Sequence, residues 1–263
     1  MSNSEVVIAD QSPVVAGSEH DGKITLAIDI GGTRLKAGLL DPAGRMFQGP
    51  IRTETPHPAT PVAVVDALVG IVRQLGHFDR VSVGFPGVVR KGVVRTAPNL
   101  GTEQWAGFWL ADELARRLGK PVRVANDGTV QGLGVISGKG VECVITLGTG
   151  MGFAVFQDGF PGPHLELSQH IARKDKTYDQ YVGNATYLDI GRKRWNKRVT
   201  RVIAALDVLV NYDALLIGGG NSKHIDFDLP EHVRVVPNEA GITGGVQLWA
   251  PKMDDTAEFR TDG

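Results

Sequence analysis

Short apolar runs that suit β-strands alternate along this chain with stretches whose apolar residues recur at helical spacing. The strand-like runs lie near residues 24–30, 80–84, 122–125, 143–147, 214–217 and 232–236. Helical spacing is clearest for the set Trp195, Val199, Val202, Ile203 and Leu206, which predicts an amphipathic helix with one buried face. The alternation of the two patterns predicts an α/β protein.

Length and loop signals divide the chain. At 263 residues it exceeds the usual size of about 150 residues for one domain, so two domains are expected. The stretch "RRLGKPVRV" predicts a boundary near residue 120, because Gly119 and Pro121 separate a helix from the next strand. We expect a polar N-terminal lead-in over 1–23, α/β domains over 24–120 and 121–249, and a C-terminal tail over 250–263.

The composition excludes several classes of protein. The 28 basic and 29 acidic residues nearly cancel, so no global charge points to a nucleic-acid partner. No apolar run approaches the roughly 18 residues that span a bilayer, and the N-terminus lacks the basic start and apolar core of a signal peptide. A cytoplasmic protein with no membrane partner is therefore expected. The one cysteine, Cys143, excludes a disulfide framework within the chain and a multi-cysteine zinc site.

A strand–glycine turn–strand pattern occurs twice in the sequence. Residues 24–40 and 143–156 each read as strand, glycine turn and strand, with Gly31, Gly32 and Thr33 in the first turn and Gly148, Thr149 and Gly150 in the second. Gly31 and Gly32 are expected to take the positive φ angles of a tight hairpin. Glycine turns often only join strands, but two of them also predict a phosphate chain held between backbone N–H groups and the two Thr hydroxyls. Asp29, just before the first turn, is a candidate ligand for Mg²⁺, directly or through water.

Several motifs in order resemble a known superfamily. "DIGGTRLKAG" and "TLGTGMG" are similar to the first and second phosphate motifs of the actin, hexokinase and heat-shock chaperone superfamily. "VSVGFPGVV", "NDG" and "LLIGGGN" narrow the resemblance to the ROK sugar kinases and repressors, and "LELSQH" with "GRKRWNKRV" to the polyphosphate glucokinases. The resemblance, over residues 24 to 249, implies the two-domain actin/hexokinase-like (ribonuclease H-like) fold with a ligand cleft between the domains.

Asp127 has two interpretations from the residues alone. It follows the strand-like run "VRVAN", so it is either the cap of a helix starting near Thr129 or a base at the mouth of a sheet. The resemblance implies that it is the catalytic base for the 6-hydroxyl of a sugar, and that role is compatible with capping. Asn126, next to Asp127, is a candidate for binding sugar hydroxyls, which amides satisfy well. The resemblance also implies sugar contacts at Asn99 and Glu166; otherwise Asn99 is an ordinary turn residue and Glu166 a solvated loop carboxylate.

The chain departs from the family pattern after Glu166. The family motif E-x-G-H would place a glycine and a histidine where this chain has Ser168 and Gln169. Gln169 can still bind a hydroxyl, and His170 either compensates for the missing histidine or is an ordinary surface residue. The cysteine cluster that holds structural zinc in many ROK proteins is missing as well, so no structural zinc is expected.

Two segments point to different phosphoryl donors. Arg194, Lys197, Arg198 and Arg201 form a cationic stripe at helical spacing, with Arg173, Lys174 and Lys176 in a nearby segment. The stripe is either a solvated face or a binding site for inorganic polyphosphate. Gly218, Gly219, Gly220 and Asn221 resemble the family's adenosine-side loop and support ATP. The sequence does not choose between the donors.

The sequence is consistent with three functional hypotheses. The first is a Mg²⁺-dependent kinase that phosphorylates glucose at its 6-hydroxyl, using polyphosphate, ATP or both. The second is a sugar-binding protein with little catalysis, marked by the altered "LELSQH" loop. The third is a regulator that touches nucleic acid through the basic helix, although the 23 residues before the first motif cannot supply a helix-turn-helix. A homodimer is usual in the resembling family and is expected here.

Overall fold

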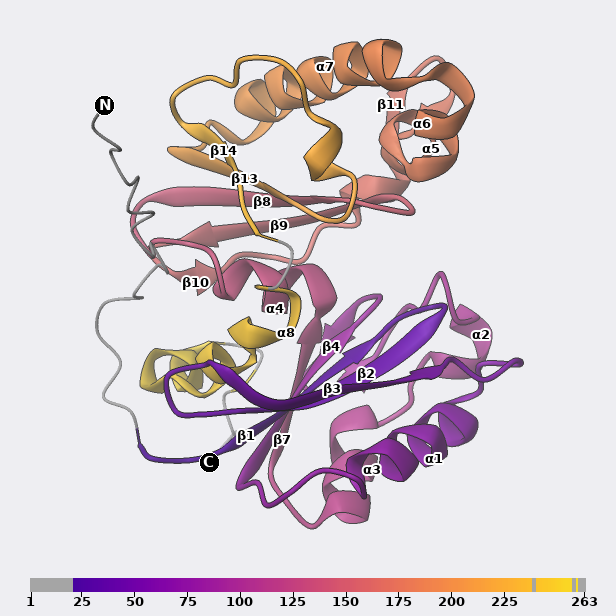
Figure 1. The fold of residues 1–263 in the computed structure, drawn as a ribbon, viewed down its shortest axis with the longest axis vertical. Helices are drawn as coiled ribbons and strands as arrows, with labels where there is room; N and C mark the ends of the chain where they lie inside the picture. The colour runs from indigo at the N-terminus through magenta and orange to yellow at the C-terminus, as the bar shows by residue number, and fades with distance from the viewer. Residues whose placement is uncertain (1–20, 238–239, 257–258, 260–263) are drawn as a thin grey trace, which may run out of the picture.

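Two five-stranded sheets form the two halves of the molecule, with short helices between them (Figure 1). The computed structural model describes residues 21–237, 240–256 and 259. Most of the N-terminal lead-in expected over 1–23, and residues 257–258 and 260–263 of the expected tail, lie outside these ranges. No helix among the described residues is long and apolar enough to cross a membrane.

The first sheet has the strand order β3-β2-β1-β4-β7. The strands are β1 (Thr25–Ile30), β2 (Arg34–Leu40), β3 (Met46–Glu54), β4 (Arg80–Phe85) and β7 (Val122–Asn126). β1, β2 and β3 pair antiparallel, whereas β1, β4 and β7 run parallel. The carboxyl ends of β1, β4 and β7 therefore meet at one edge, where open α/β sheets bind their ligands.

Helices cover one face of this sheet. They are α1 (Pro61–Val72) and α3 (Leu110–Leu118), and the shorter elements nearby are α2 (Thr102–Trp105), β5 (Val89–Arg90) and β6 (Val93–Val94). The side chain of Thr60 caps α1 by accepting from the backbone N–H of Ala63. Trp105, fully buried, packs on Phe85 and donates its indole N–H to the Ala59 carbonyl oxygen, which fixes α2 against the sheet.

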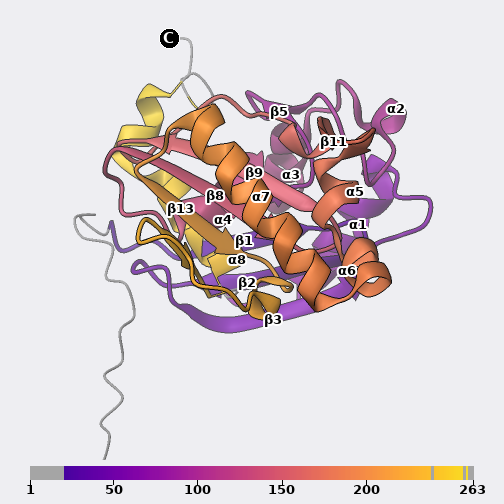
Figure 2. The same cartoon turned by 90° about the horizontal axis from the view of Figure 1, so that it is seen from above.

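The second sheet has the order β10-β9-β8-β13-β14. The strands are β8 (Val141–Leu147), β9 (Met151–Gln157), β10 (Phe160–Pro161), β13 (Ala214–Gly218) and β14 (Val233–Val235). The helix α7 (Arg192–Val210) lies across it (Figure 2). The apolar stripe predicted for this helix, from Trp195 to Leu206, is buried against β8 and β13, as amphipathicity requires.

Smaller elements surround one end of the second sheet. They are the 3₁₀ turn η1 (Leu167–Gln169), β11 (Ile171–Arg173), β12 (Lys176–Thr177), α5 (Tyr178–Val182), α6 (Asn184–Ile190) and the 3₁₀ turn η2 (Ser222–His224). Thr177 and Gln180 form a capping box at the start of α5. The helix α5 contacts β11, η1 and α7, so it joins the loops of this half to its long helix.

Two segments connect the halves. One is α4 (Asp127–Leu133), and the other is the returning C-terminal segment of α8 (Ala240–Thr243), η3 (Gly244–Trp249) and η4 (Pro251–Asp255). Both lie between the sheets in Figure 1. The Ser82 hydroxyl donates to the Gly245 carbonyl oxygen at 2.6 Å and accepts from the Trp249 indole N–H at 2.9 Å, which fastens the C-terminal segment to β4.

The sheet pairing differs from the predicted division of the chain. β7 lies beyond the boundary expected near residue 120, yet it pairs with β4 in the first sheet, so that sheet continues to Asn126. The segment around Gly245 was assigned to the second domain and contacts the first sheet instead. The physical reason is that strand pairing and burial, and not the loop signal at Gly119 and Pro121, decide where β7 belongs.

Candidate active site

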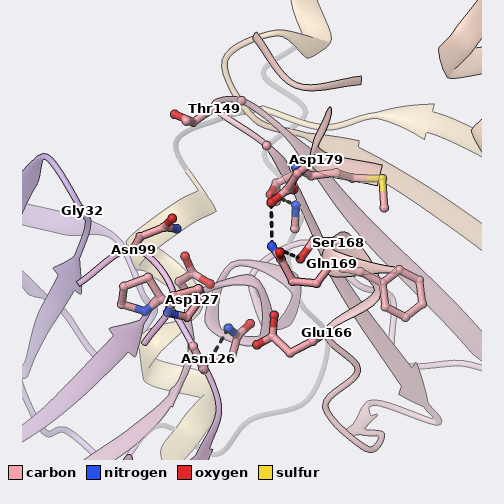
Figure 3. Close-up of a pocket in the computed structure, with 18 of the residues that line it drawn as sticks. Gly32, Asn99, Asn126, Asp127, Thr149, Glu166, Ser168, Gln169 and Asp179 are labelled. Carbon is pink, nitrogen blue, oxygen red and sulfur yellow. Dashed lines mark hydrogen bonds between the residues drawn. The ribbon is translucent and has the colours of Figure 1, made fainter. Parts of the chain in front are cut away.

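A cavity of about 310 Å³ lies between the two glycine hairpins. The residues that line it and are used below are Gly31, Gly32, Asn99, Asn126, Asp127, Gly148, Thr149, Gly150, His164, Glu166, Ser168, Gln169 and Asp179. Figure 3 shows Asn99, Asn126 and Asp127 on one side, and Thr149, Glu166, Gln169 and Asp179 on the other. The fold thus brings together most of the residues predicted for catalysis, phosphate binding and sugar binding; Thr33 and His170 do not line the cavity.

Asp127 is the first residue of α4, directly after β7. The helix begins two residues earlier than the predicted start near Thr129, and its cap is Asn126. The Asn126 side-chain oxygen accepts from the backbone N–H groups of Gly128 and Thr129, at 2.9 and 3.3 Å. Asp127 Oδ1 accepts from the Gly128 N–H at 2.8 Å, and no protein donor reaches Oδ2 from the described residues. One carboxylate oxygen is therefore available to a ligand in the cavity.

The surroundings of Asp127 disfavour its charged form. Burial raises the pKa of its carboxyl from 3.8 to about 6, and the negative charge of Asp29 adds to the shift. The hydrogen bond from Gly128 and the side chain of His164 act in the opposite direction. A carboxyl with a pKa near 6 is ionised at neutral pH and still basic enough to accept a proton.

Asn126 has a structural role in addition to the predicted sugar contact. Its side-chain N–H₂ donates to the carbonyl oxygens of Gly87 and Phe85, at 3.2 and 3.4 Å, while its oxygen caps α4. The side chain therefore ties β7, α4 and the loop after β4 together. These contacts fix the position of Asp127, the next residue.

The first hairpin needs its glycines for space and not for backbone angle. Neither Gly31 nor Gly32 has a positive φ, so the predicted conformation is wrong. A Cβ at Gly31 would lie 2.8 Å from the Arg34 carbonyl oxygen, and one at Gly32 would lie 3.3 Å from Asn99 Cβ. The absence of side chains lets the hairpin turn tightly and lets Asn99 lie against it. Thr33 is exposed and is not among the residues lining the cavity.

Asp29 lies at the end of β1, beside the first hairpin. Its Oδ2 accepts from Lys36 Nζ at 2.7 Å across the β1–β2 pair. The described residues contain no group of three or more acidic, His or Cys side chains that could hold a metal ion. Mg²⁺ is usually held by one or two carboxylates together with substrate phosphates and water. The arrangement fits Mg²⁺ that binds with a phosphate donor and uses Asp29 as one ligand, directly or through water.

The second hairpin packs against α5. A Cβ at Gly150 would overlap the Asp179 carboxylate, and a Cβ at Gly183 would overlap the Thr149 carbonyl oxygen. Asp179 Oδ1 accepts from the Met151 N–H at 2.7 Å, at the foot of the hairpin. Gly148, by contrast, has open space where a Cβ would be. The hairpin therefore combines one glycine that contacts α5, Gly150, with one that has open space beside it, Gly148.

The altered loop after Glu166 supplies a hydrogen-bonded group to the cavity. Gln169 Nε2 donates to Asp179 Oδ2 at 2.9 Å (Figure 3). Glu166 Oε1 lies 2.9 Å from His164 Nε2. His170 is exposed, bonds through its ring to the Ile171 carbonyl oxygen and is not among the residues lining the cavity. His164, two residues before Glu166, occupies the wall instead.

Asp179 and His164 are the residues that sequence reasoning missed. Burial raises the pKa of the Asp179 carboxyl, and the nearby charge of Glu166 adds to this, while the bonds from Met151 and Gln169 oppose it. In the sequence, Asp179 stands in the first turn of a capped helix, where acidic residues are common because of the helix dipole. The position in a capped helix therefore gives no sign that Asp179 also lines the cavity, and no sequence pattern singles out His164.

The remaining predicted residues lie around the cavity. Gly219 has a φ of 86°, and a Cβ there would overlap the backbone of Leu147. Asn221 is buried, and its side-chain N–H₂ donates to the Gly148 carbonyl oxygen at 3.3 Å. The loop from Gly218 to Asn221 therefore packs against the second hairpin, through Leu147 and Gly148. Its contact with adenosine stays a prediction.

The cationic stripe lies on α7. Arg194, Lys197 and Arg201 are exposed and Arg198 is half-buried, and of these four side chains Arg198 and Arg201 contact Tyr181. The Arg198 guanidinium lies 4.7 Å from the centre of the Tyr181 ring and donates to the Tyr181 carbonyl oxygen at 3.1 Å. The stripe is thus divided between two free side chains and two that are already oriented.

Fold and site together define a phosphotransferase cleft of the actin/hexokinase-like type. The ROK family model matches residues 25–162, about half of the chain. The chain belongs to the ROK family.

Individual relatives extend the match over most of the chain. Polyphosphate glucokinase of Mycobacterium tuberculosis (strain CDC 1551 / Oshkosh) is 34% identical over 248 residues, covering 86% of this chain and 93% of the relative. The polyphosphate glucokinase of Mycobacterium leprae is 33% identical, with 86% and 74% covered.

Among solved structures, the inorganic polyphosphate/ATP-glucomannokinase of Arthrobacter sp. strain KM superimposes with a TM-score of 0.76. It is 31% identical to this chain, and the match covers 86% of this chain and 97% of the other. The ROK family glucokinase of Streptomyces griseus, crystallised with glucose and AMPPNP, has a TM-score of 0.71 at 22% identity, covering 87% and 99%. That second likeness concerns the fold. The chain is a phosphotransferase.

Proposed function

We propose that this protein is a glucokinase that transfers a phosphoryl group from inorganic polyphosphate, ATP or both to the 6-hydroxyl of glucose, with Asp127 as general base. The observation that carries the proposal is the position of Asp127. Its unpaired oxygen faces a cavity whose opposite ends are the two glycine hairpins. The names of the relatives, polyphosphate glucokinase and polyphosphate/ATP-glucomannokinase, support glucose as the acceptor and both donors.

The reaction needs positioning more than covalent help. Asp127 accepts the proton of the sugar 6-hydroxyl as that oxygen forms a bond to the terminal phosphorus. The bond between this phosphorus and the bridging oxygen of the donor breaks, and the shortened polyphosphate or ADP leaves. The backbone N–H groups of the hairpins and the hydroxyl of Thr149 hold the phosphates. Mg²⁺, when bound with the donor near Asp29, neutralises phosphate charge.

The sugar hydroxyls face polar side chains from both halves. Asn99 from the first half and Glu166, Gln169 and Asp179 from the second all line the cavity. Amides and carboxylates can donate to or accept from several hydroxyls at once. Because Gln169 and Asp179 bond to each other, they are arranged before the sugar arrives.

Formation of sugar 6-phosphate from glucose and Mg²⁺, with polyphosphate and ATP in parallel reactions, tests the proposal. Product with either donor in the wild type, and its near-complete loss in Asp127→Asn, is the expected result. Unchanged turnover in that variant would remove Asp127 as base. Size-exclusion chromatography with light scattering tests the proposed homodimer in the same preparation.

A second candidate is a sugar-binding protein with little turnover. The observation in its favour is that Gln169, which replaces the expected histidine, donates to Asp179 and so has one N–H fewer for a sugar. Calorimetric binding of glucose without product from either donor would support this candidate over the kinase.

A further inference from the structure

A second cavity, of about 260 Å³, lies on the far side of α5 from the hairpins. Its lining residues come from β11, α5 and α7, and they are Ala172, Arg173, Tyr178, Tyr181, Arg201, Val202 and Ala205. The helix α5 contacts both β11 and α7. None of the lining residues is acidic, and two of them are arginines from different elements.

No acidic side chain among the described residues forms an ion pair with either arginine. Among the described residues, no carboxylate pairs with Arg173 or Arg201, whereas Arg45, Arg116 and Arg117 each lie within ion-pair distance of an Asp or Glu. Guanidinium groups without a carboxylate partner leave their N–H donors free for an anion. Planar guanidinium groups are well suited to phosphate, because they donate two parallel hydrogen bonds.

Tyr181 holds the cationic side chains in place. Arg201 Nη1 donates to the Tyr181 hydroxyl at 3.4 Å, and Arg198 covers the ring at 4.7 Å. These contacts limit the rotamers of two long side chains before any ligand binds. The loss of side-chain entropy when Arg201 binds an anion is therefore smaller than for a free surface arginine, whereas Arg173 is exposed and has no such contact among the described residues.

The helix α5 links this cavity to the active site. Tyr178 and Tyr181 line the second cavity, while Asp179 lines the first and bonds to Met151 at the second hairpin. Gly183, at the end of α5, lies against the Thr149 carbonyl oxygen. The two cavities are thus separated by the width of one short helix, about 10 Å. Occupation of both cavities by one donor therefore requires a phosphate chain that passes over α5.

We propose that the cavity between β11, α5 and α7 binds phosphate groups of the polyphosphate donor remote from the reacting end, with Arg173 and Arg201 as ligands. The proposal rests on the proposed use of polyphosphate. It assigns the cationic stripe a defined binding site at Arg201 and adds Arg173, which lies outside the stripe. It also predicts that long polyphosphate gains affinity from this cavity, whereas tripolyphosphate and ATP do not.

The test compares two double variants with equal loss of charge. Arg173→Gln with Arg201→Gln removes the proposed ligands. Lys193→Gln with Lys223→Gln removes two exposed cations that line neither cavity. For the arginine pair we expect the KM for long-chain polyphosphate to rise roughly tenfold or more, as for the loss of two charge-assisted hydrogen bonds. Kinetics with ATP and with tripolyphosphate should be unchanged, and the lysine pair should behave as the wild type.

Equal losses in the two double variants would overturn the site, because they would show a general effect of charge. An unchanged KM in the arginine pair would overturn it too. Tyr181→Phe, which removes only the hydroxyl that Arg201 contacts, should give a smaller rise in the same KM. Thermal unfolding of each variant separates a lost ligand from a lost fold.

Calorimetry with long-chain polyphosphate distinguishes failure of this site from failure of the proposed function. If the wild type uses ATP alone, polyphosphate is not a donor. Calorimetric binding of polyphosphate still tests whether the second cavity binds it. Binding that weakens in the arginine pair and persists in the lysine pair supports the site. Binding that is absent or equal in all three proteins overturns it.

Discussion

The two glycine hairpins look alike in the sequence and use their glycines differently. In the first, both glycines make room for neighbours within the first half, the Arg34 carbonyl oxygen and Asn99. In the second, Gly150 makes room for Asp179 from α5, while Gly148 has nothing near it. The first hairpin packs within its own half, and the second packs against a separate helix, α5, whose Asp179 also accepts from Gln169.

The carboxylates near the hairpins differ in the same way. Asp29 belongs to the strand that leads into the first hairpin and is paired with Lys36 on the next strand. Asp179 comes from a different element and is held by the Met151 N–H and by Gln169. Similar glycine patterns thus stand beside two different kinds of carboxylate. Asp29 is paired with a lysine of its own sheet, and Asp179 joins the second hairpin to the loop after Glu166.

The largest effect on activity is expected for a change at Asp127, in the cavity between the two hairpins. Asp127→Asn keeps the shape of the side chain and removes the base, so kcat should fall by about 10² or more with either donor. Steady-state kinetics measures the fall, and calorimetric binding of glucose should change little. A variant with wild-type kcat would show that the hairpins hold the donor without help from this carboxylate.

The difference between the two glycines of the second hairpin gives the next prediction. Gly150→Ala places a methyl group against Asp179 and should lower the free energy of unfolding by about 1–3 kcal/mol, the usual cost of overpacking, as measured by denaturant unfolding. Gly148→Ala is the matched control, since its methyl group enters open space without a positive φ, and it should fold and unfold like the wild type. Equal losses in both would break the comparison.

The dependence of the reaction on pH follows from the raised pKa of Asp127. The base must be ionised, and with a pKa of about 6 the ionised fraction rises as pH increases through that value. Between pH 7 and pH 5 we expect kcat/KM to fall about tenfold. Initial rates at fixed Mg²⁺ record this ascending limb, and the residual activity of Asp127→Asn should lack it. A flat profile over this range would mean that the carboxyl is not the base.

The smallest effect, a shift of the pH dependence, is expected for a change at Lys36 beside the first hairpin. Lys36→Gln removes the cation that offsets Asp29, so more negative charge acts on Asp127 and favours its protonated form. The ascending limb should move to higher pH, by less than about one unit because the pair is partly exposed to solvent. Lys23→Gln removes an exposed charge at the other end of β1 and should leave the limb in place. A limb that moves to lower pH in Lys36→Gln would contradict the coupling between Asp29 and Asp127.

Local pattern was sufficient for most elements of the fold. Each of the six predicted strands exists with ends displaced by a few residues, and the stripe from Trp195 to Leu206 is buried as expected. Chain geometry within a few residues also placed Asp127 at the end of a strand. Such features depend on neighbouring residues, which is why one sequence shows them.

Contacts between distant residues decided the rest. β7 joins the first sheet, and Gly245 returns to Ser82 across 163 positions, so the predicted boundaries did not match the pairing. Asp179 reaches Met151 across 28 positions, and Arg173 and Arg201, from β11 and α7, line the same cavity. The sequence by itself determined the strands, the two hairpins and Asp127. Only the tertiary structure decided which carboxylate faces which hairpin and where the unpaired arginines gather, because those positions result from packing between segments that no local pattern relates.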